Sequence, residues 1–219
     1  MKSILHRNVL QALLVAFASF ALSALLNANL RAADVLRPDS EGYIRDWVML
    51  APIALPDGES GADAVFKEQV KDEAALRPNA GDKVKIRGKE LTWQTITAST
   101  NYFDFNAILK TVNDHAAGYM VAYIECETDI PDVIMAVASN DEGRIYFNGV
   151  DIYVFNEPRT LMLDADKGRV TLKKGINVVV FKVINEQNSW QGAMRLLKGG
   201  APLKDVRIKL SPEATTTVK

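Results

Sequence analysis

Short segments in which apolar and polar residues alternate fill most of the chain after residue 83. Roughly ten of them are separated by turn residues every 8–12 positions, a spacing typical of an antiparallel sandwich or barrel. The clearest candidates are 119–125, 133–138, 145–147, 152–155, 170–172, 178–183, 194–197 and 206–210. A parallel α/β fold would need helical crossovers between its strands, and none is visible after Gly81. The pattern therefore predicts an all-β antiparallel fold.

Two hairpins are predicted in the second half of the chain. Asn148 and Gly149 separate two alternating runs, and both central residues of a type I′ turn need a positive φ, which Asn and Gly tolerate at the least cost. A second turn, 173–175, leads into the apolar run 176–184. We expect each turn to join two neighbouring strands.

The segment before residue 83 predicts a strand and one short helix. The strand is expected over 43–50 and should end at Pro52, because proline has no N–H to donate to a neighbouring strand. From 60 to 75 the pattern changes, and Ser60 is a candidate N-cap. Apolar residues recur there at a four-residue spacing: Phe66, Val70 and Ala74. We expect a helix whose charged face is solvated.

The first 33 residues have the layout of a secretory signal peptide. Lys2 and Arg7 precede the apolar run 9–26, and small residues follow it. A run of this length is also near the minimum that spans a bilayer about 30 Å thick, so an uncleaved membrane anchor is the alternative. We expect a secreted or periplasmic protein with a signal-peptide helix over 1–33, a β-sandwich domain over 34–210 and a flexible tail over 211–219.

Charge and cysteine content narrow the partners and the means of stabilisation. Removing residues 1–33 leaves 23 basic and 27 acidic residues, a net charge of −4. This balance gives no reason to expect nucleic acid as a partner. Cys126 is the only cysteine, so an exported chain cannot form an intrachain disulfide and must be stabilised by its core. We expect Cys126 to be a small buried apolar residue.

Several segments resemble the galactose-binding-like β-sandwich (jelly-roll) modules appended to secreted bacterial glycoside hydrolases. The similarity runs in order through YIRDWVMLAP, GKELTW, AGYMVAYIECET, SNDEGRIYFNG, VTLKKGINVVVFKV and SWQGAMRL. The matching positions are Ser139, Asp141, Gly143, Asn148, Gly149, Leu172, Lys173, Gly175, Asn177, Lys182, Trp190 and Arg195. Glu142 stands where these modules usually have a second aspartate, and Tyr146 where tryptophan is common. The resemblance implies a jelly-roll sandwich, whereas its motif residues mostly build turns and core and do not identify a ligand.

No catalytic signature is visible. Acyl transfer needs a nucleophile beside a base, usually histidine, and His115 is the only histidine after residue 33. Glycoside hydrolysis needs two carboxyl groups facing across a cleft, but 27 acidic residues make chance pairs common. Asp141 and Asn148 also fit turn residues that bond to nearby backbone. We expect a protein that is not an enzyme, with a small glycoside hydrolase or esterase as the least favoured alternative.

The function favoured by the sequence is non-catalytic binding, with carbohydrate as the first choice of ligand. Aromatic rings and a few polar groups in a shallow site recognise such ligands. Tyr146 alternates with Ile145 and Phe147, so it should face outward if those two face the core. The predicted ligand-binding residues are Tyr146, Tyr153, Asn156, Arg159, Asn185, Asn188, Trp190 and Gln191. The alternative is a structural or protein-interaction β-sandwich of the cell envelope with no sugar site.

A structural calcium ion would suit the loops of such a sandwich, because they offer carboxylates and backbone carbonyls. The candidate ligands are Asp141, Asp164 and Asp166. No other cofactor is expected. The expected partners are carbohydrate or another secreted or envelope protein, and membrane contact would require that the leader is not cleaved.

Overall fold

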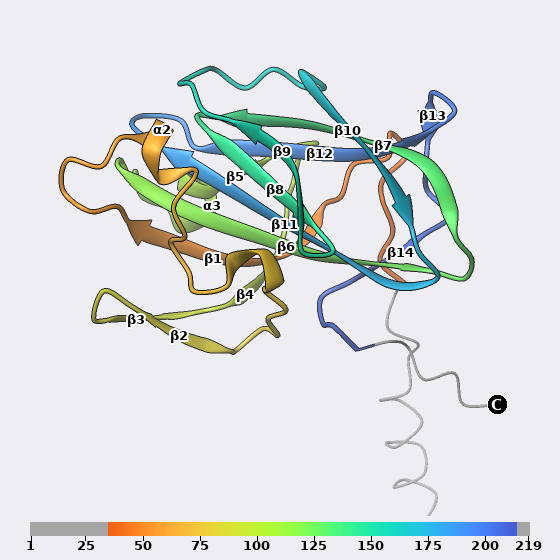
Figure 1. Cartoon of the computed structure of the whole chain (residues 1–219), viewed down its shortest axis with the longest axis horizontal. Coiled ribbons are helices and arrows are strands. Elements are labelled where there is room, and N and C mark those ends of the chain that lie inside the picture. The colour runs from red at the N-terminus through yellow and green to blue at the C-terminus, as the bar shows by residue number, and fades with distance from the viewer. Residues whose placement is uncertain (1–34, 214–219) are drawn as a thin grey trace, which may run out of the picture. The chain divides into compact units, whose positions relative to one another are not determined.

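The computed structural model describes residues 35–213, and these residues form two antiparallel sheets and a third, smaller layer (Figure 1). The predictions for residues 1–33 and for most of the C-terminal tail lie outside this range. No helix within 35–213 is long and apolar enough to cross a membrane. The all-β antiparallel sandwich is confirmed.

The larger sheet has seven strands in the order β4-β1-β6-β11-β8-β9, with β14 paired to β6. Its strands are β1 (Asp46–Ala54), β4 (Gln94–Thr97), β6 (Ala116–Cys126), β8 (Gly143–Phe147), β9 (Val150–Phe155), β11 (Gly175–Asn185) and β14 (Arg207–Lys209). β6 and β11 pair along their whole length, from Gly175 opposite Cys126 to Asn185 opposite Ala116. These two strands are therefore the centre of the fold.

The second sheet has five strands in the order β10-β7-β12-β13, with β5 paired to β12. Its strands are β5 (Phe103–Asp104), β7 (Ile130–Asn140), β10 (Asp166–Leu172), β12 (Gln191–Lys198) and β13 (Ala201–Pro202). A separate hairpin joins β2 (Lys83–Ile86) to β3 (Lys89–Thr92). The helical elements are α2 (Gly61–Ala64), the 3-10 helix η1 (Glu73–Ala75) and α3 (Phe105–Leu109).

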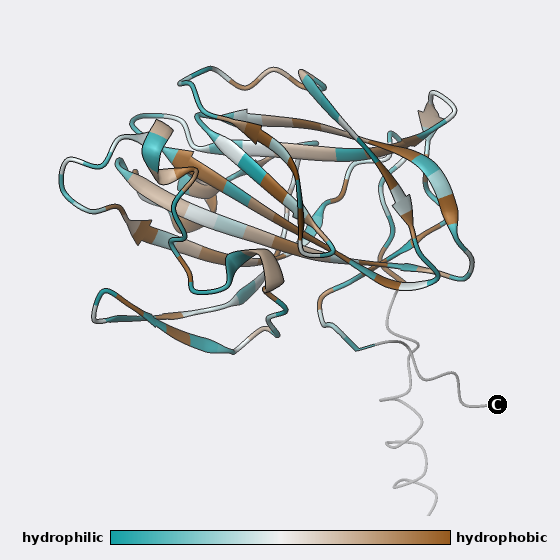
Figure 2. Cartoon of the chain, in the orientation of Figure 1, coloured by the Kyte–Doolittle hydropathy of each residue, from teal (hydrophilic) through white to brown (hydrophobic). Residues whose placement is uncertain are grey.

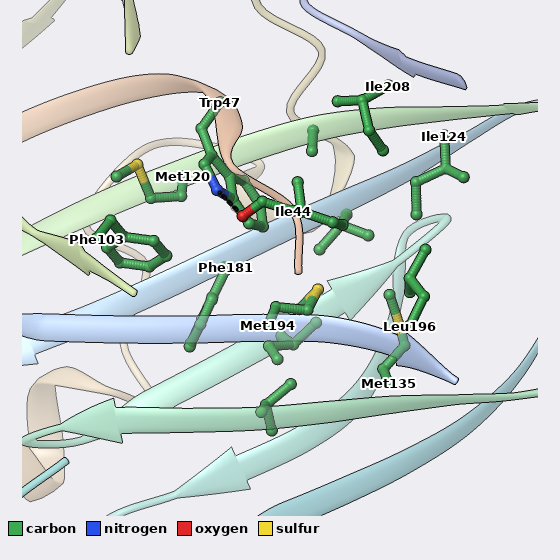
Figure 3. Close-up of a cluster of buried hydrophobic side chains, with 14 of the residues drawn as sticks. Ile44, Trp47, Phe103, Met120, Ile124, Met135, Phe181, Met194, Leu196 and Ile208 are labelled. Carbon is green, nitrogen blue, oxygen red and sulfur yellow. Dashed lines mark hydrogen bonds between the residues drawn. The ribbon is translucent and has the colours of Figure 1, made fainter. Parts of the chain in front are cut away.

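The core between the two sheets is built around aromatic and sulfur-containing side chains (Figure 3). Trp47 and Phe181 each meet Phe103 edge to face, with ring centroids 5.7 Å apart in both pairs. The Trp47 indole N–H donates to the carbonyl of Ile44 at 3.0 Å. Each such ring adds roughly 1.5–3 kcal/mol through burial of its apolar surface, so these contacts contribute strongly to the stability of the sandwich.

The other face of the seven-stranded sheet is also buried, beneath a segment that we call the outer layer (residues 55–93). It contains α2, η1 and the β2–β3 hairpin. Val65, Val70 and Trp93 from the outer layer pack with side chains of β6, β8 and β11 such as Tyr119 and Val180. Both faces of β11 are thus covered, in keeping with its largely apolar colouring in Figure 2.

The predicted helix over 60–75 is wrong in its extent. Ser60 does cap a helix, since its hydroxyl oxygen accepts a hydrogen bond from the Asp63 N–H at 3.2 Å, but α2 ends at Ala64. The chain then follows the sheet surface and forms η1, where Glu73 is buried. Val70 and Glu73 are both buried along this path, which has no continuous helical repeat. Phe66 is left 52% exposed.

The predicted end of the first strand is also wrong. β1 continues through Pro52 to Ala54, and its register against β6 shifts between Leu50 and Ile53. A bulge of this kind accommodates a proline, because the missing N–H falls where the regular pairing is interrupted. The strand therefore reaches the outer layer before it ends.

One of the two predicted hairpins is confirmed. Asn148 and Gly149 have φ angles of 51° and 83°, and they join β8 to β9. The turn at 173–175 instead connects the two sheets, because β10 pairs with β7 whereas β11 pairs with β6 and β8. α3 was not expected, since 103–108 has the alternation of a strand. Asp104 caps it by accepting from the Ala107 N–H at 2.9 Å.

Candidate functional site

Two of the three aromatic residues that the sequence predicted to bind a ligand, Tyr146 and Trp190, are buried. Trp190 is 0% exposed, stacks on Phe105 with centroids 4.2 Å apart, and donates its indole N–H to the carbonyl of Val183 at 3.2 Å. Tyr146 points away from Ile145, as expected, but into the outer layer. Neither ring has a face free for a ligand, so the prediction is wrong for both residues.

Tyr146 belongs to a buried network centred on Glu73. Its hydroxyl donates to Glu73 Oε1 at 2.6 Å, and the hydroxyl of Tyr119 donates to Glu73 Oε2. Lys182 Nζ lies 2.8 Å and 3.1 Å from the two carboxylate oxygens and also donates to the carbonyl of Lys67 at 3.0 Å. Burial lowers the pKa of Lys182, against the attraction of Glu73. The network fastens the outer layer to the sheet.

Three of the predicted residues, Tyr153, Arg159 and Asp166, do come together. Arg159 Nη2 lies 2.6 Å from the Tyr153 hydroxyl and 2.7 Å from Asp166 Oδ2, and its guanidinium carbon is 3.6 Å from the centroid of the Phe155 ring. Burial and the hydrogen bond to Asp166 raise the pKa of Tyr153. Arg159 also donates to the carbonyl of Ser139 at 3.1 Å. The group therefore anchors the β9–β10 loop, which begins at the exposed Asn156.

The other predicted residues, Asn185, Asn188 and Gln191, fasten the 185–191 loop to the segment 104–114. Asn185 is fully buried and donates to the carbonyl of Asn113 at 2.6 Å. The partners of the other two lie in the same segment. The backbone N–H of Asn188 donates to Asp114 at 2.9 Å, and its carbonyl accepts from Asn106 at 2.7 Å. The side chain of Gln191 donates to Asp104 at 2.9 Å. These polar groups stabilise the loop end of the sandwich.

The candidate calcium ligands do not form one ligand set. Asp164 pairs with Arg195, Asp166 pairs with Arg159, and Asp141 accepts from the Glu186 N–H at 3.1 Å. Across residues 35–213, no group of three or more His, Cys, Asp or Glu side chains is placed to hold a metal ion. Two of the three aspartates are therefore paired with arginine.

An exposed aromatic ring that the sequence did not indicate lies on the outer layer. We call its surroundings the Phe66 patch (Phe66, Arg144, Asp151 and Val154). The guanidinium carbon of Arg144 lies 5.7 Å from the Phe66 ring centroid, and Arg144 Nη1 donates to the Phe66 carbonyl at 3.2 Å. Arg144 Nε and Nη2 both donate to Asp151 Oδ2, at 2.9 Å and 2.7 Å. Val154 is paired with Arg144 across the β8–β9 hairpin and is 41% exposed.

Only part of the Phe66 patch could have been found from the sequence. The Asn148–Gly149 turn fixes the hairpin and so brings Val154 beside Arg144. The exposure of Phe66 depends on where α2 ends. The four-residue spacing suggested instead that this ring lay on the apolar side of a longer helix.

Comparison with known proteins adds little to this geometry. No family model and no curated protein matches the chain. Among solved structures, the chain is similar to one described as "PA14 sugar-binding domain from RTX adhesin", with 14% sequence identity and a TM-score of 0.39. The match covers 74% of this chain and 96% of that one. A similarity of this size does not identify a ligand, and the resemblance to galactose-binding-like modules stays a prediction.

Proposed function

We propose that this domain is a non-catalytic carbohydrate-binding module and that the Phe66 patch is its binding surface. The observation that carries the proposal is an exposed aromatic ring beside a fixed, partly exposed ion pair. An aromatic ring offers an apolar face to the C–H groups of a sugar ring, and polar groups at its border fix the hydroxyls. The leader predicted over residues 1–33 supports an exported module.

The ion pair beside Phe66 is well suited to hydroxyl recognition. Both hydrogen bonds from Arg144 end on Asp151 Oδ2, which leaves Asp151 Oδ1 without a partner among the described residues. The Asp151 side chain is 39% exposed. The guanidinium carbon of Arg144 also lies 4.9 Å from the centroid of the Tyr146 ring. A polar group that is already held in place loses little conformational freedom on binding.

The same geometry supports binding rather than hydrolysis. A glycosidase places two carboxyl groups on either side of the bond that it cleaves, whereas Asp151 is the one carboxylate of the Phe66 patch and is paired with Arg144. His115, the candidate base of an esterase, has its Nε2 atom 3.1 Å from the carbonyl of Pro56.

Affinity gel electrophoresis and a glycan array with the purified domain test the proposal. We expect Phe66→Ala to weaken glycan binding by about tenfold or more, in line with the loss of an aromatic contact, and Asp151→Asn to weaken it less. Val112→Ala is the matched control, because Val112 is an apolar side chain that is 67% exposed outside the patch. Uniformly absent binding of the wild type to plant, algal and bacterial glycans would overturn the proposal.

A protein-interaction module is the second candidate, and the edge strand β9 favours it. β9 ends the seven-stranded sheet and, among the described residues, pairs only with β8. Val150 is 63% exposed and lies on the same strand as Val154. An unpaired strand with exposed apolar side chains can pair with an extended segment of another protein. Cross-linking from Val154→Cys to an envelope protein, together with absent glycan binding, would favour this function.

A further inference from the structure

A groove lies between the end of β1 and the tip of the β2–β3 hairpin. We call it the hairpin groove; it is lined by residues 52–54 of β1 and by Ile86, Arg87, Lys89 and Leu91 of the hairpin. Its volume is about 190 Å³, which is that of roughly six water molecules in the liquid. Ile53 and Leu91 are buried, and Ile86 packs against the same cluster of apolar side chains. The hairpin groove therefore suits a small molecule with an apolar body.

The register of the hairpin places a lysine on its apolar side. Ile86 pairs with Lys89, and Val84 pairs with Leu91. Residues directly opposite one another, and those two positions further along each strand, share one face of a strand pair. The three apolar members of this set pack towards the seven-stranded sheet, so Lys89 lies on the face that lines the groove. Lys89 has no hydrogen-bond or ion-pair partner among the residues that the structure describes.

Arg87 supplies a second cation, and the fold holds it in place. Arg87 and Gly88 form the turn of the hairpin, with φ angles of 48° and 84°. Such two-residue turns favour Asn and Gly, since a positive φ is uncommon for other residues. The Arg87 guanidinium donates to the carbonyl of Ala54 at 2.8 Å and to the side-chain oxygen of Gln69. Both acceptors are neutral, so these bonds fix the cation without pairing its charge.

No acidic side chain lines the hairpin groove in the part of the chain that the structure describes. Arg87 does act on the nearby carboxylate of Glu59. That carboxylate is already bonded to Lys67 at 2.9 Å and to the side-chain amide of Gln69 at 3.2 Å. Two cations thus border an apolar surface, and charge complementarity favours an anionic ligand.

We propose that the hairpin groove binds a small organic carboxylate with an apolar body. The carboxylate accepts charge-assisted hydrogen bonds from Arg87 and Lys89, and the body covers the apolar lining formed by Ile53, Ile86 and Leu91. Burial of apolar surface adds to the attraction between charges, which salt weakens at an exposed site. Both parts of the ligand are therefore needed. The site is separate from the Phe66 patch and does not depend on glycan binding.

A titration of the purified protein with sodium hexanoate, followed by two-dimensional ¹H–¹⁵N NMR, tests the proposal. We expect the amide signals of the β2–β3 hairpin to shift and to reach saturation at millimolar hexanoate. Hexan-1-ol keeps the apolar chain without the charge, and acetate keeps the charge without the chain. Each of these two should bind at least about tenfold more weakly than hexanoate.

Two lysine variants locate the site. Lys89→Ala should weaken hexanoate binding by about tenfold, because a hydrogen bond from a charged donor is lost. Lys85→Ala is the matched control, since Lys85 is also exposed but pairs with Glu90 on the opposite face of the hairpin. It should change the affinity by less than about twofold.

Four results would overturn the proposal. Hexanoate could leave the hairpin signals unchanged, or hexan-1-ol could bind as tightly as hexanoate, which would show an apolar groove without an anion site. Acetate could bind as tightly as hexanoate, which would show that the apolar lining takes no part. An equal loss of affinity in Lys85→Ala and Lys89→Ala would show general attraction of anions to a basic hairpin.

Discussion

Replacing Glu73 with glutamine should destabilise the domain strongly, because it leaves the charge of Lys182 buried without a counter-ion. The side chains of Lys182 and Glu73 are 0% and 1% exposed. Removing one partner of a buried ion pair costs about 3–5 kcal/mol, since the remaining charge keeps its desolvation cost. Gln retains an oxygen that can accept from Tyr119 or Tyr146, so the change isolates the loss of charge.

The lower end of that range is expected for this pair. Lys182 also donates to the carbonyls of Ala64 and Lys67, at 3.4 Å and 3.0 Å, and these bonds remain in Glu73→Gln. Burial already lowers the pKa of Lys182, so the variant can release the proton instead of keeping a buried charge. We therefore expect a loss of about 3 kcal/mol at pH 7. The loss should shrink as the pH rises, because release of the Lys182 proton on folding then costs less free energy.

Equilibrium unfolding in urea measures this loss. Glu90→Gln is the matched control, because Glu90 forms an ion pair with Lys83 whose side chains are 63% and 60% exposed. An exposed pair of this kind contributes about 0–1 kcal/mol. If Glu73→Gln loses no more stability than Glu90→Gln, the buried pair does not fasten the outer layer, and the reasoning fails.

Three further predictions have clear expected outcomes. Gly61→Ala should lower the free energy of unfolding by about 1–3 kcal/mol, because the added Cβ would meet the carboxyl group of Glu142. Gly168→Ala is the control: an added Cβ there has its nearest neighbour at 3.5 Å, so the same urea titration should show little change. Cys126 is 4% exposed and burial raises its thiol pKa to about 11, so a thiol reagent at pH 8 should label it slowly in the native state and fully in urea; equal rates would contradict this. Phe66→Ala should change the free energy of unfolding by less than about 1 kcal/mol, because the Phe66 ring is exposed. Trp190→Ala should lower the free energy of unfolding by about 3–5 kcal/mol. If thermal unfolding shows the larger loss for Phe66→Ala, the two rings have been assigned the wrong roles.

The strands and one tight turn of this fold could be predicted from the sequence because their determinants are local. Alternation located β8 and β9, and the Asn148–Gly149 turn joined them as expected. The apolar run 176–184 fits a strand buried on both faces, but it does not show which part of the chain covers that strand. That depends on Glu73, which meets Lys182 across 109 residues of sequence. Tyr146 was assigned to the wrong environment for the same reason.

The candidate site was harder to predict than the fold, because polar and aromatic residues stabilise loops as readily as they bind ligands. Tyr153 and Arg159 were chosen for their chemistry, and they do meet, but their polar groups bond to one another and to Asp166. Spacing along the chain cannot show whether the polar groups of a side chain are already bonded to another part of the protein. Nor can it show that Phe66 lies outside the core, since this follows from the early end of α2.

The position of Lys182 also matters before the domain has folded. It is the one charged residue of β11, where it separates the apolar residues 178–181 from Val183 and Ile184. Uninterrupted segments of this composition, exposed on a newly made or unfolded chain, associate readily into intermolecular β-structure. A charge within the segment opposes that association. The lysine that fixes the outer layer in the native state therefore also protects the unfolded chain from aggregation.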